Sequence, residues 1–597
     1  MKKLSDYVIE SLADFGVKHI FMLTGGGCMH LTDSIGRHPA IDYVCCLHEQ
    51  ACAFAAEHYA EYTDHLGVAL VTTGPGGTNA VTGLTAAWLE SAPVLLLSGQ
   101  AKRADLIGGR AVRNMGPQEV NIIEVVKPVT KYAKTVLDPE SIRYELEKAL
   151  YLATHGRRGP VWLDLPLDVQ ASQIDETNLV EFHPPALPRA EALEPQVARA
   201  IRLLNRAERP VLMIGNGCRR SPELVRQLID TLRIPVLVTW KAIDMVADAC
   251  EYFAGRPGLI GQRGANFSQQ NSDCMLVAGA RLDLLQTAFN HRNFARAAAK
   301  ILVDIDPAEI AKLDMEIDVP ICADTADFIR EFLRQSGSLA PRDRTCWVKR
   351  TKEWQERYPV VTSEHWNGQS FVSTYALVDV LSDELGPDDL LVPGSSGACS
   401  EVFLQAFRVK AGQRIVNAPT LGAMGTGLPG TIGACVASCG RRTVSINGDG
   451  GFQLNIQELE TVHRLNLPIK YFILCNGSYA SIMATQRNYF QGRFAGADPS
   501  SHLTFPDIRR LAAAYGIQTA HIHDHSNLRQ RVREVLALAG PVICAVDVSS
   551  NEVTAPRVGS QVQPDGTIVS APMEDMSPLL DREEFAANMI IPPLEER

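Results

Sequence analysis

The sequence lacks an N-terminal secretion signal and any run long enough to span a membrane. Its first residues, MKKLSDYVIE, become polar too soon for the apolar core of a signal peptide. No apolar run approaches the length that a bilayer requires. We therefore expect a cytoplasmic protein that does not interact with membranes.

The sequence also lacks an excess of basic residues. It contains 57 Lys and Arg against 68 Asp and Glu, which gives a net charge of −11. General nucleic-acid binders and proteins that bind acidic membranes normally carry a basic face. The charge balance therefore argues against nucleic-acid partners.

Four sequence patterns are missing as well. Cys28, Cys45, Cys46 and Cys52 lie close together, but without the paired C-x-x-C spacing of a zinc site. There is no low-complexity tract and no short-period repeat. No G-x-G-x-x-G follows the first strand pattern, which argues against a NAD dehydrogenase.

What is present is a regular alternation of short apolar runs with helical patterns. The runs end in glycine or a polar turn, as in GVALVTTGPGG, RPVLMIGNG, RTVSINGDG and YFILCNGS. Continuous rather than alternating apolar runs are typical of parallel strands covered on both faces. The sequence therefore predicts α/β units with parallel sheets.

Two stretches rich in proline and charge divide the chain. The first is EFHPPALPRAEALEP at 181–195, and the second runs from about 336 to 370 around a Trp-containing helix. We predict domains at 1–180, 190–335 and 370–550, followed by a tail at 551–597.

The stretch TVSINGDGGFQLNIQELE (443–460) places a carboxylate among glycines where an apolar run ends and a helical pattern begins. Asn455 and Glu458 fit a capping box. A glycine-rich turn at the carboxyl end of a strand presents free N–H groups to a phosphate. Asp449 would repel a bare phosphate, so we expect a divalent cation between the two.

A second apolar run, IKYFILCN, ends in Asn476. In a parallel sheet its end can lie beside the Asp449 turn. A carboxylate, an amide oxygen and a backbone carbonyl are ligands that Mg²⁺ prefers. The alternative is an ordinary strand-end turn capped by Asp449, but the strand–helix–strand spacing and the terminal asparagine favour the metal site.

This combination resembles the diphosphate-binding motif of thiamine-diphosphate (ThDP) enzymes, and residues 1–550 resemble the acetolactate synthase branch. The resemblance implies three doubly wound α/β domains, which are pyrimidine-binding, central and diphosphate-binding, before the tail. It implies that Asp449, Asn476 and the backbone oxygen of Ser478 hold Mg²⁺. The cofactor-binding turn is then formed by Gly448, Gly450, Gly451 and Phe452.

The segment LGAMGTGLPG (421–430) resembles the part of the family that shapes the cofactor. The resemblance implies that the carbonyl of Gly422 accepts a hydrogen bond from the 4′-amino group of ThDP. Met424 would be the apolar wedge beneath the bent cofactor, although a methionine among glycines is more often a gap filler.

Glu49, in VCCLHEQACAFAAEHYA, stands where an apolar run meets a helix of small residues. By itself it would be a first-turn residue that complements the helix dipole. With the ThDP motif present, HEQ followed by TTGPGGTN matches the pyrimidine-binding pattern. ThDP reacts through its C2 carbanion, which its 4′-imino group generates once a protein acid hydrogen-bonds N1′. Glu49 is the candidate for this catalytic role.

Further positions follow from the same resemblance. Gln118 in NMGPQEVN would face the substrate, and the cofactor's pyrimidine would be lined by Gly25, Gly26, Pro75 and Asn79. In this family the cofactor lies between the first domain of one subunit and the third domain of another. A homodimer or homotetramer with active sites at the interface is therefore implied.

The central domain of acetolactate synthases binds FAD. The corresponding positions here are Arg157, Gly261, Gly264, Arg281 and Asp306. The chain departs from that pattern at Leu285, where a second arginine is usual, and at Arg263, where histidine is common. FAD is therefore one expectation for this domain, and ADP or no ligand is the other.

The acceptor side departs further. Leu167 replaces a lysine, Pro117 replaces an aromatic residue, and Ser481 and Thr485 stand where acetolactate synthases have Met and a large Trp. We predict an enzyme that decarboxylates a 2-keto acid such as pyruvate and transfers the acyl anion to a carbonyl acceptor. Acetolactate synthase proper, a 2-keto acid decarboxylase and a non-catalytic regulatory relative are the alternatives.

The tail extends past the end expected for this family. Packing against a neighbouring subunit and a lid over the active site are the two interpretations of it. The first is at least as well supported by the sequence.

Overall fold

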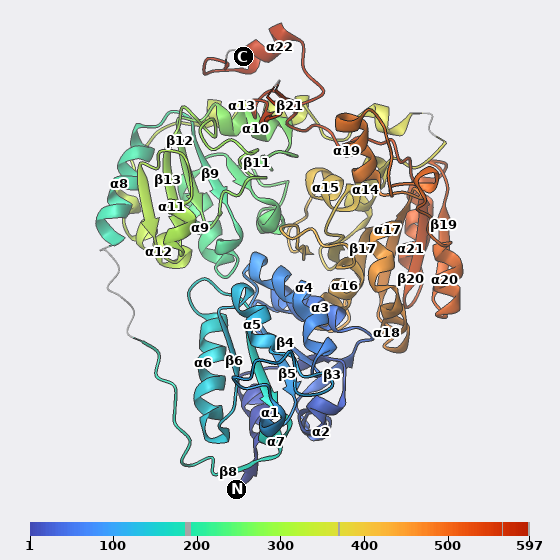
Figure 1. The fold of residues 1–597 in the computed structure, drawn as a ribbon. Helices are drawn as coiled ribbons and strands as arrows, with labels where there is room; N and C mark the ends of the chain where they lie inside the picture. The colour runs from blue at the N-terminus through green and yellow to red at the C-terminus, as the bar shows by residue number, and fades with distance from the viewer. Residues whose placement is uncertain (186–192, 368–369, 564, 595–597) are drawn as a thin grey trace.

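The structure is a computed structural model that describes residues 1–185, 193–367, 370–563 and 565–594. Three six-stranded sheets form its framework, and the strands within each are parallel. Figure 1 shows the three lobes, with the N-terminal domain at the bottom, the central domain at the upper left and the C-terminal domain at the right. The predicted fold class is confirmed. Residues 186–192 and 368–369, which belong to the two predicted linkers, lie outside the described residues.

The N-terminal domain has the strand order β3-β2-β4-β5-β7-β6. Its strands are β2 (His19–Met22), β3 (Asp42–Cys45), β4 (Gly67–Val71), β5 (Val94–Gln100), β6 (Tyr132–Thr135) and β7 (Val161–Pro166). Its helices are α1 (Leu4–Asp14), α2 (Met29–Arg37), α3 (Glu49–Thr63), α4 (Pro75–Glu90), α5 (Ile122–Val126), α6 (Ile142–Thr154) and α7 (Leu167–Ala171). A small antiparallel pair, β1 (Lys2–Lys3) and β8 (Gln173–Ile174), joins the ends of the domain.

The central domain has the order β11-β10-β9-β12-β13-β14. Its strands are β9 (Pro210–Ile214), β10 (Val236–Val238), β11 (Phe253–Gly255), β12 (Cys274–Ala278), β13 (Ala299–Asp304) and β14 (Val319–Cys322). Its helices are α8 (Leu193–Arg206), α9 (Pro222–Leu232), α10 (Arg263–Gln270), α11 (Pro307–Ala311) and α12 (Thr325–Arg334). The Trp-containing helix expected in the second linker is α13 (Thr345–Arg357), which packs on α10.

The C-terminal domain has the order β16-β15-β17-β18-β20-β19. Its strands are β15 (Leu390–Pro393), β16 (Arg414–Ile415), β17 (Thr443–Gly448), β18 (Ile469–Cys475), β19 (Gln518–Ile522) and β20 (Val542–Asp547). Its helices are α14 (Thr374–Glu384), α15 (Ala398–Ala406), α16 (Gly427–Ala437), α17 (Asp449–Phe452), α18 (Leu459–Arg464), α19 (Ala480–Phe490), α20 (Ile508–Ala514) and α21 (Leu528–Ala537).

The central strands of each sheet are buried along nearly their whole length, as the continuous apolar runs predicted. Every residue of β4, β5, β9 and β12 is buried. Such strands need helices on both faces, and the intervening helices supply them. The carboxyl ends of the strands are therefore the places where the chain opens toward solvent.

Helix α3 joins the N-terminal and C-terminal domains because it is made largely of small buried residues. It packs on α4 on one side and on α16 on the other. A Cβ atom on Gly433 of α16 would lie 2.0 Å from the carbonyl oxygen of Ala55, and one on Gly83 of α4 would lie 2.5 Å from Cβ of Ala53. Glycine at these two positions permits the close approach. The start of α3, at Glu49, is thereby fixed between two domains.

The predicted capping box at Asn455 and Glu458 is wrong. Asn455 has non-helical dihedrals inside an irregular turn, and its side chain donates to Gln50 (3.0 Å) and to the carbonyl of Gly425 (2.8 Å). Glu458 accepts from the backbone N–H of Leu47 at 2.8 Å. Both side chains make long-range contacts to other segments, so they do not cap the helix.

The tail packs on the central domain of its own chain. It contains a hairpin, β21 (Ser560–Val562) with β22 (Ile568–Ser570), and helix α22 (Arg582–Asn588), which Figure 1 shows above α10 and α13. Trp354 Nε1 donates to Asn588 Oδ1 at 2.8 Å. Arg263, one of the departures from the family pattern, donates to the carbonyls of Met576 and Pro578. The unusual arginine therefore anchors the unusual tail.

The fourteen cysteines all lie in described residues and form no disulfide. Among the described residues, no helix has both the length and the apolar character that crossing a membrane demands.

Candidate active site

The turn between β17 and α17 buries a carboxylate at the carboxyl edge of the C-terminal sheet. Asp449 is only 7% exposed. Its Oδ1 accepts from the N–H of Gly450 at 2.8 Å, and its Oδ2 accepts from the N–H groups of Asn476 (3.0 Å) and Gly477 (2.8 Å). Because β17 and β18 are neighbours in register, the turns that follow them meet at this point.

The Asn476 side chain lies in the same turn. Its Oδ1 accepts from the backbone N–H of Ser478 at 3.0 Å and from the Ser478 hydroxyl at 3.1 Å. The structure thus brings together the three residues that the sequence predicted as metal ligands: Asp449, Asn476 and Ser478. Backbone N–H groups in the turns after β17 and β18 hold the side chains of Asp449 and Asn476 in place.

The electrostatics of this turn fit a bound cation. Burial raises the pKa of Asp449 to about 6, although hydrogen bonds from backbone N–H groups oppose the shift. No Lys or Arg within the described ranges forms an ion pair with it. A buried carboxylate without a counter-ion is unfavourable, and a divalent cation would supply the missing positive charge.

The same turn leaves room for a ligand. A Cβ atom on Gly448 or on Gly451 would have no other atom within 4 Å, so open space lies in front of both. A Cβ on Gly450 would instead lie 2.4 Å from the ring of Tyr479, so this glycine is required by packing. Phe452 is buried edge-to-face on Tyr471. An open cradle of backbone N–H groups beside a buried carboxylate suits a diphosphate with its metal.

The segment that contains Gly422 and Met424 lies between β16 and α16. Gly422 has φ +62°, a conformation that favours glycine, and Met424 is half-buried. The Ser395 hydroxyl donates to the carbonyl of Ala423 and so ties this segment to the turn after β15.

On the N-terminal domain, Glu49 is the first residue of α3 and is 7% exposed. Its Oε2 accepts from Asn79 Nδ2 of α4 at 3.0 Å, so the structure brings together two of the predicted site residues. Among the described residues, no hydrogen bond is made to its Oε1. Oε1 is therefore the oxygen of this carboxyl group that can form a hydrogen bond with a ligand.

The other predicted residues of this half lie on adjacent loops. A Cβ atom on Gly25 would lie 2.4 Å from Thr72 Oγ1, so the Gly25–Gly26 loop packs tightly on the end of β4. Pro75 begins α4. Gln118 is exposed, has φ +64°, and its carbonyl oxygen would lie 2.7 Å from a Cβ on Gly74. The Gln118 loop therefore adjoins the Pro75 turn.

Within one chain the two halves of the predicted site are joined by residues next to Glu49. Contacts between them run from Leu47 and Gln50 to Glu458 and Asn455. In the part of the chain that the structure describes, no hydrogen bond or ion pair joins Glu49 to Asp449, Asn476 or Ser478.

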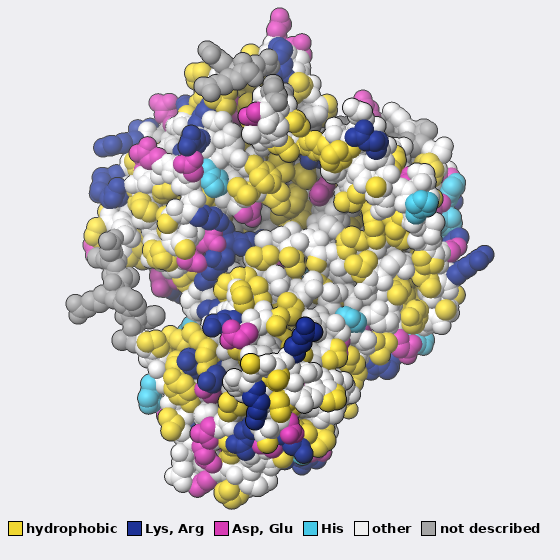
Figure 2. Space-filling view, viewed as in Figure 1, with side chains coloured by type: hydrophobic (Ala, Val, Ile, Leu, Met, Phe, Trp, Pro, Cys, Tyr) yellow, Lys and Arg dark blue, Asp and Glu magenta, His cyan; other side chains and the backbone are white. Residues whose placement is uncertain are grey.

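A cavity of about 590 Å³ lies where the three domains meet. Its walls include Arg157, Arg281 and Asp304 on one side and Ser395, Gly397 and Gly422 of the C-terminal domain on another. Figure 2 shows this face hollowed between the lobes, with hydrophobic side chains in the hollow.

The five positions suggested for FAD fall into two groups. Arg157 and Arg281 line the cavity, and Arg281 donates to the carbonyl of Leu89 and to Thr420. Asp306 instead caps α11 through Ala308 N–H and pairs with Arg157 at 2.8 Å, whereas Asp304 and Ile305 reach the wall. Gly261 and Gly264 are packed against backbone, at the Arg256–Gly258 turn and at α13 respectively.

Glu401 of α15 is among the residues of the cavity wall that were not predicted from the sequence. Burial raises the pKa of its carboxyl, and Oε2 accepts from the Thr554 hydroxyl of the tail at 3.1 Å. The sequence around Glu401 contains no known motif. What could have indicated it is a single acidic residue in the otherwise apolar segment ACSEVFLQAF.

Comparison with known proteins identifies the class. The "Thiamine pyrophosphate enzyme" family models match as an N-terminal TPP binding domain at residues 2–125, a central domain at 197–332 and a C-terminal TPP binding domain at 395–546. The chain therefore belongs to the thiamine-diphosphate-dependent enzymes (thiamine pyrophosphate is the same cofactor).

Individual proteins that are similar to this chain indicate which type of ThDP enzyme it is. The acetolactate synthase large subunit of Pyropia yezoensis is 30% identical over 574 residues, which cover 92% of each chain. Acetolactate synthase 1, chloroplastic, of Nicotiana tabacum is 31% identical over 570 residues, covering 94% of this chain and 84% of that protein. The chain is thus a ThDP-dependent enzyme of the acetolactate synthase type.

Proposed function

We propose that the enzyme uses ThDP and Mg²⁺ to decarboxylate a small 2-keto acid, pyruvate or a close analogue, and joins the acyl unit to a carbonyl acceptor. The observation that carries the proposal is the buried Asp449 carboxylate at the paired ends of β17 and β18, beside an open glycine turn. The names of the similar proteins support the same chemistry.

In this proposal Asp449, Asn476 Oδ1 and the Ser478 carbonyl hold Mg²⁺, and the backbone N–H groups around Gly448 and Gly451 contact the diphosphate. ThDP itself supplies the electron sink that decarboxylation of a 2-keto acid requires. The chain's own contribution here is to hold charged groups in fixed positions before the substrate arrives.

Glu49 hydrogen-bonds N1′ of the cofactor and holds the proton that favours the reactive tautomer. Asn79 fixes the orientation of its carboxylate. Gln118 lies on the loop beside Pro75 and faces the substrate.

The family resemblance implies that the cofactor lies between two subunits, so in this proposal a second copy completes each site. We propose a homodimer, or a homotetramer built from it, in which Glu49 of one subunit faces the Asp449 turn of its partner.

We further propose that the acceptor is neutral and bulkier than a second pyruvate, such as a ketosugar or an aldehyde. Ser481 and Thr485 are small and exposed on one face of α19. A Cβ on Gly397 would lie 3.1 Å from Ser481 Oγ, so this face adjoins the cavity wall.

Competition between acceptors tests this specificity. With pyruvate as donor, we expect aldehydes and ketosugars to outcompete a second keto acid, and mass spectrometry of the products reads the outcome. Thr485→Trp fills the acceptor space and should lower kcat/KM for the bulky acceptor by roughly 10- to 200-fold, as volume-based discrimination allows. Thr485→Val, which keeps the volume, is the matched control.

Two results of the same experiment favour other functions. Efficient formation of acetolactate with no competing acceptor identifies an acetolactate synthase proper. Release of the free aldehyde without ligation identifies a 2-keto acid decarboxylase.

The cavity between the domains is the proposed site of FAD. A purified protein that is yellow, or becomes yellow after incubation with FAD and gel filtration, is the expected result.

Arg281→Ala should weaken FAD retention at least tenfold because a cation of the wall is lost, whereas Arg292→Ala, a change at an 80% exposed side chain, should not. Wild-type protein that stays colourless would reject FAD binding. Bleaching of bound flavin by pyruvate at the turnover rate would make the flavin a redox cofactor rather than a structural one.

A further inference from the structure

Two histidines and an aspartate meet at the outer edge of the C-terminal sheet, on β20 and the segment of β19, one strand beyond β18. β19 is the edge strand, and His521 on it lies opposite Ala545 of β20. Residues two apart on a strand share a face, so His521 and His523 point the same way. Asp547 is two residues past Ala545 and reaches the same face.

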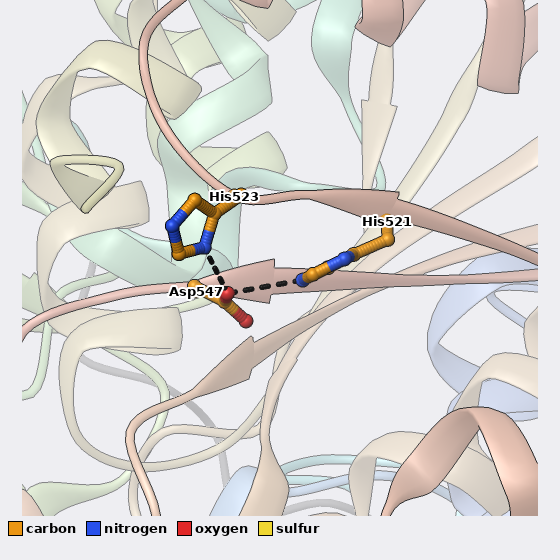
Figure 3. Close-up of side chains that lie close together, drawn as sticks. All are labelled: His521, His523 and Asp547. Carbon is orange, nitrogen blue, oxygen red and sulfur yellow. Dashed lines mark hydrogen bonds and ion pairs between the residues drawn. The ribbon is translucent and has the colours of Figure 1, made fainter. Parts of the chain in front are cut away.

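The three side chains are close enough to share a ligand. His521 Nε2 lies 3.0 Å and His523 Nδ1 lies 2.6 Å from Oδ2 of Asp547, and the three donor atoms lie within 4.8 Å of one another. Figure 3 shows both imidazole rings directed at the one carboxylate. The side chains are 36%, 58% and 27% exposed, respectively, so solvent and ions can reach them.

We propose that His521, His523 and Asp547 form a binding site for a divalent transition-metal ion, and that Zn²⁺ is the ion that fits it best. Two imidazole nitrogens with one carboxylate oxygen suit Zn²⁺, whereas Mg²⁺ prefers oxygen ligands alone. Water completes the coordination. The site shares no residue with the Asp449 turn and does not depend on the proposed function.

The geometry needs only a small adjustment. Donor atoms about 2.0–2.1 Å from a tetrahedral zinc ion stand about 3.3 Å apart. The two hydrogen-bonded pairs, at 2.6 and 3.0 Å, must therefore open by about 0.7 and about 0.3 Å, and the two imidazole nitrogens, which lie within 4.8 Å of each other, must take up the same spacing. His523 follows the end of β19 and its side chain is the most exposed of the three, so it can shift without disturbing the sheet.

The positive charge of Arg509 disfavours metal binding at this site. Its Nη1 lies 3.3 Å from Nδ1 of His521, and its guanidinium also pairs with Asp507. A guanidinium only donates, so Nδ1 of His521 accepts and its Nε2 carries the proton that is donated to Asp547. Zinc on Nε2 requires the proton to move to Nδ1, which faces Arg509. The arginine, 43% exposed, must then rotate toward solvent.

The test is a calorimetric zinc titration of the full-length protein with Mg²⁺ in excess. The cysteines are the same in all variants, so zinc that binds to thiols cancels in the comparison. We expect wild-type protein to bind one more zinc ion at micromolar concentration than His523→Gln. His183→Gln, which changes an exposed histidine elsewhere, should titrate like wild type. Arg509→Gln should bind zinc several-fold more tightly, because the opposing charge is gone and an acceptor replaces it.

Cobalt adds a spectroscopic readout. The Co²⁺ spectrum of wild type minus that of His523→Gln should contain ligand-field bands without thiolate charge transfer, as nitrogen and oxygen ligands require. Equal zinc stoichiometry and affinity in wild type and His523→Gln would overturn the proposal and leave the cluster as a hydrogen-bonded link between β19 and β20. A thiolate spectrum in the difference would also overturn it.

Discussion

Asp449→Ala should abolish Mg²⁺-dependent binding of ThDP. The carboxylate is the one charged ligand among the three proposed, and its neighbours Asn476 and Ser478 offer only neutral oxygens to the cation. We expect the ThDP affinity measured by calorimetry with excess Mg²⁺ to fall at least 100-fold.

Two further variants separate charge from folding. Asp449→Asn keeps the size of the side chain and removes its charge, so it should also lose most of the affinity. Asp524→Ala, which removes a partly exposed acid of the same domain, should bind ThDP normally. ThDP affinity unchanged in Asp449→Ala, with the far-ultraviolet circular dichroism of wild type, would show that the metal is held elsewhere.

Glu49→Gln should retain ThDP and lose its activation. Glutamine has nearly the same shape and can keep the contact with Asn79, but it cannot hold the acidic proton that N1′ requires. Loss of an acid–base partner typically costs 10²- to 10⁴-fold. The exchange rate of the cofactor C2 proton, followed by NMR, should therefore fall by about that factor while the ThDP affinity changes little.

Asn79→Ala should slow the exchange of the C2 proton by an intermediate amount. It leaves the Glu49 carboxylate in place and removes one hydrogen bond to it, so exchange should slow less than in Glu49→Gln. Wild-type exchange in Glu49→Gln would mean that Glu49 is a structural residue at the start of α3.

The strands and the glycine turn could be predicted from sequence because their signals are local. β17 and β18 are buried along nearly their whole length, and the strand-end position of Asp449 and Asn476 follows from where these strands stop. Parallel pairing of the two strands then brings their ends together.

The errors arose where a local pattern serves a distant contact. Asn455 and Glu458 have capping-box spacing, yet they bind Gln50 and Leu47 of another domain. For the cavity between the domains, the sequence suggested Asp306, while the wall contains Asp304, because the helix that follows β13 uses Asp306 as its cap. No local rule separates these uses of an aspartate.

Other features depend on tertiary structure alone. His521 and Asp547 become neighbours only through the register of β19 on β20. The tail's contact with Arg263 likewise needs α10 and the tail to be placed in space. The sequence marked Arg263 and the tail as departures, but it did not connect them.

The most direct test of the central claim follows the carbon atoms of pyruvate. Pyruvate labelled with ¹³C at C2 is incubated with the enzyme, ThDP, Mg²⁺ and a carbonyl acceptor, and the products are read by NMR and mass spectrometry. We expect CO₂ release together with a new carbon–carbon bond from the labelled carbon to the acceptor, both dependent on ThDP and greatly reduced in Glu49→Gln. Failure to release CO₂ from pyruvate or its close analogues, or labelled acetaldehyde as the sole product in the presence of acceptors, would contradict it.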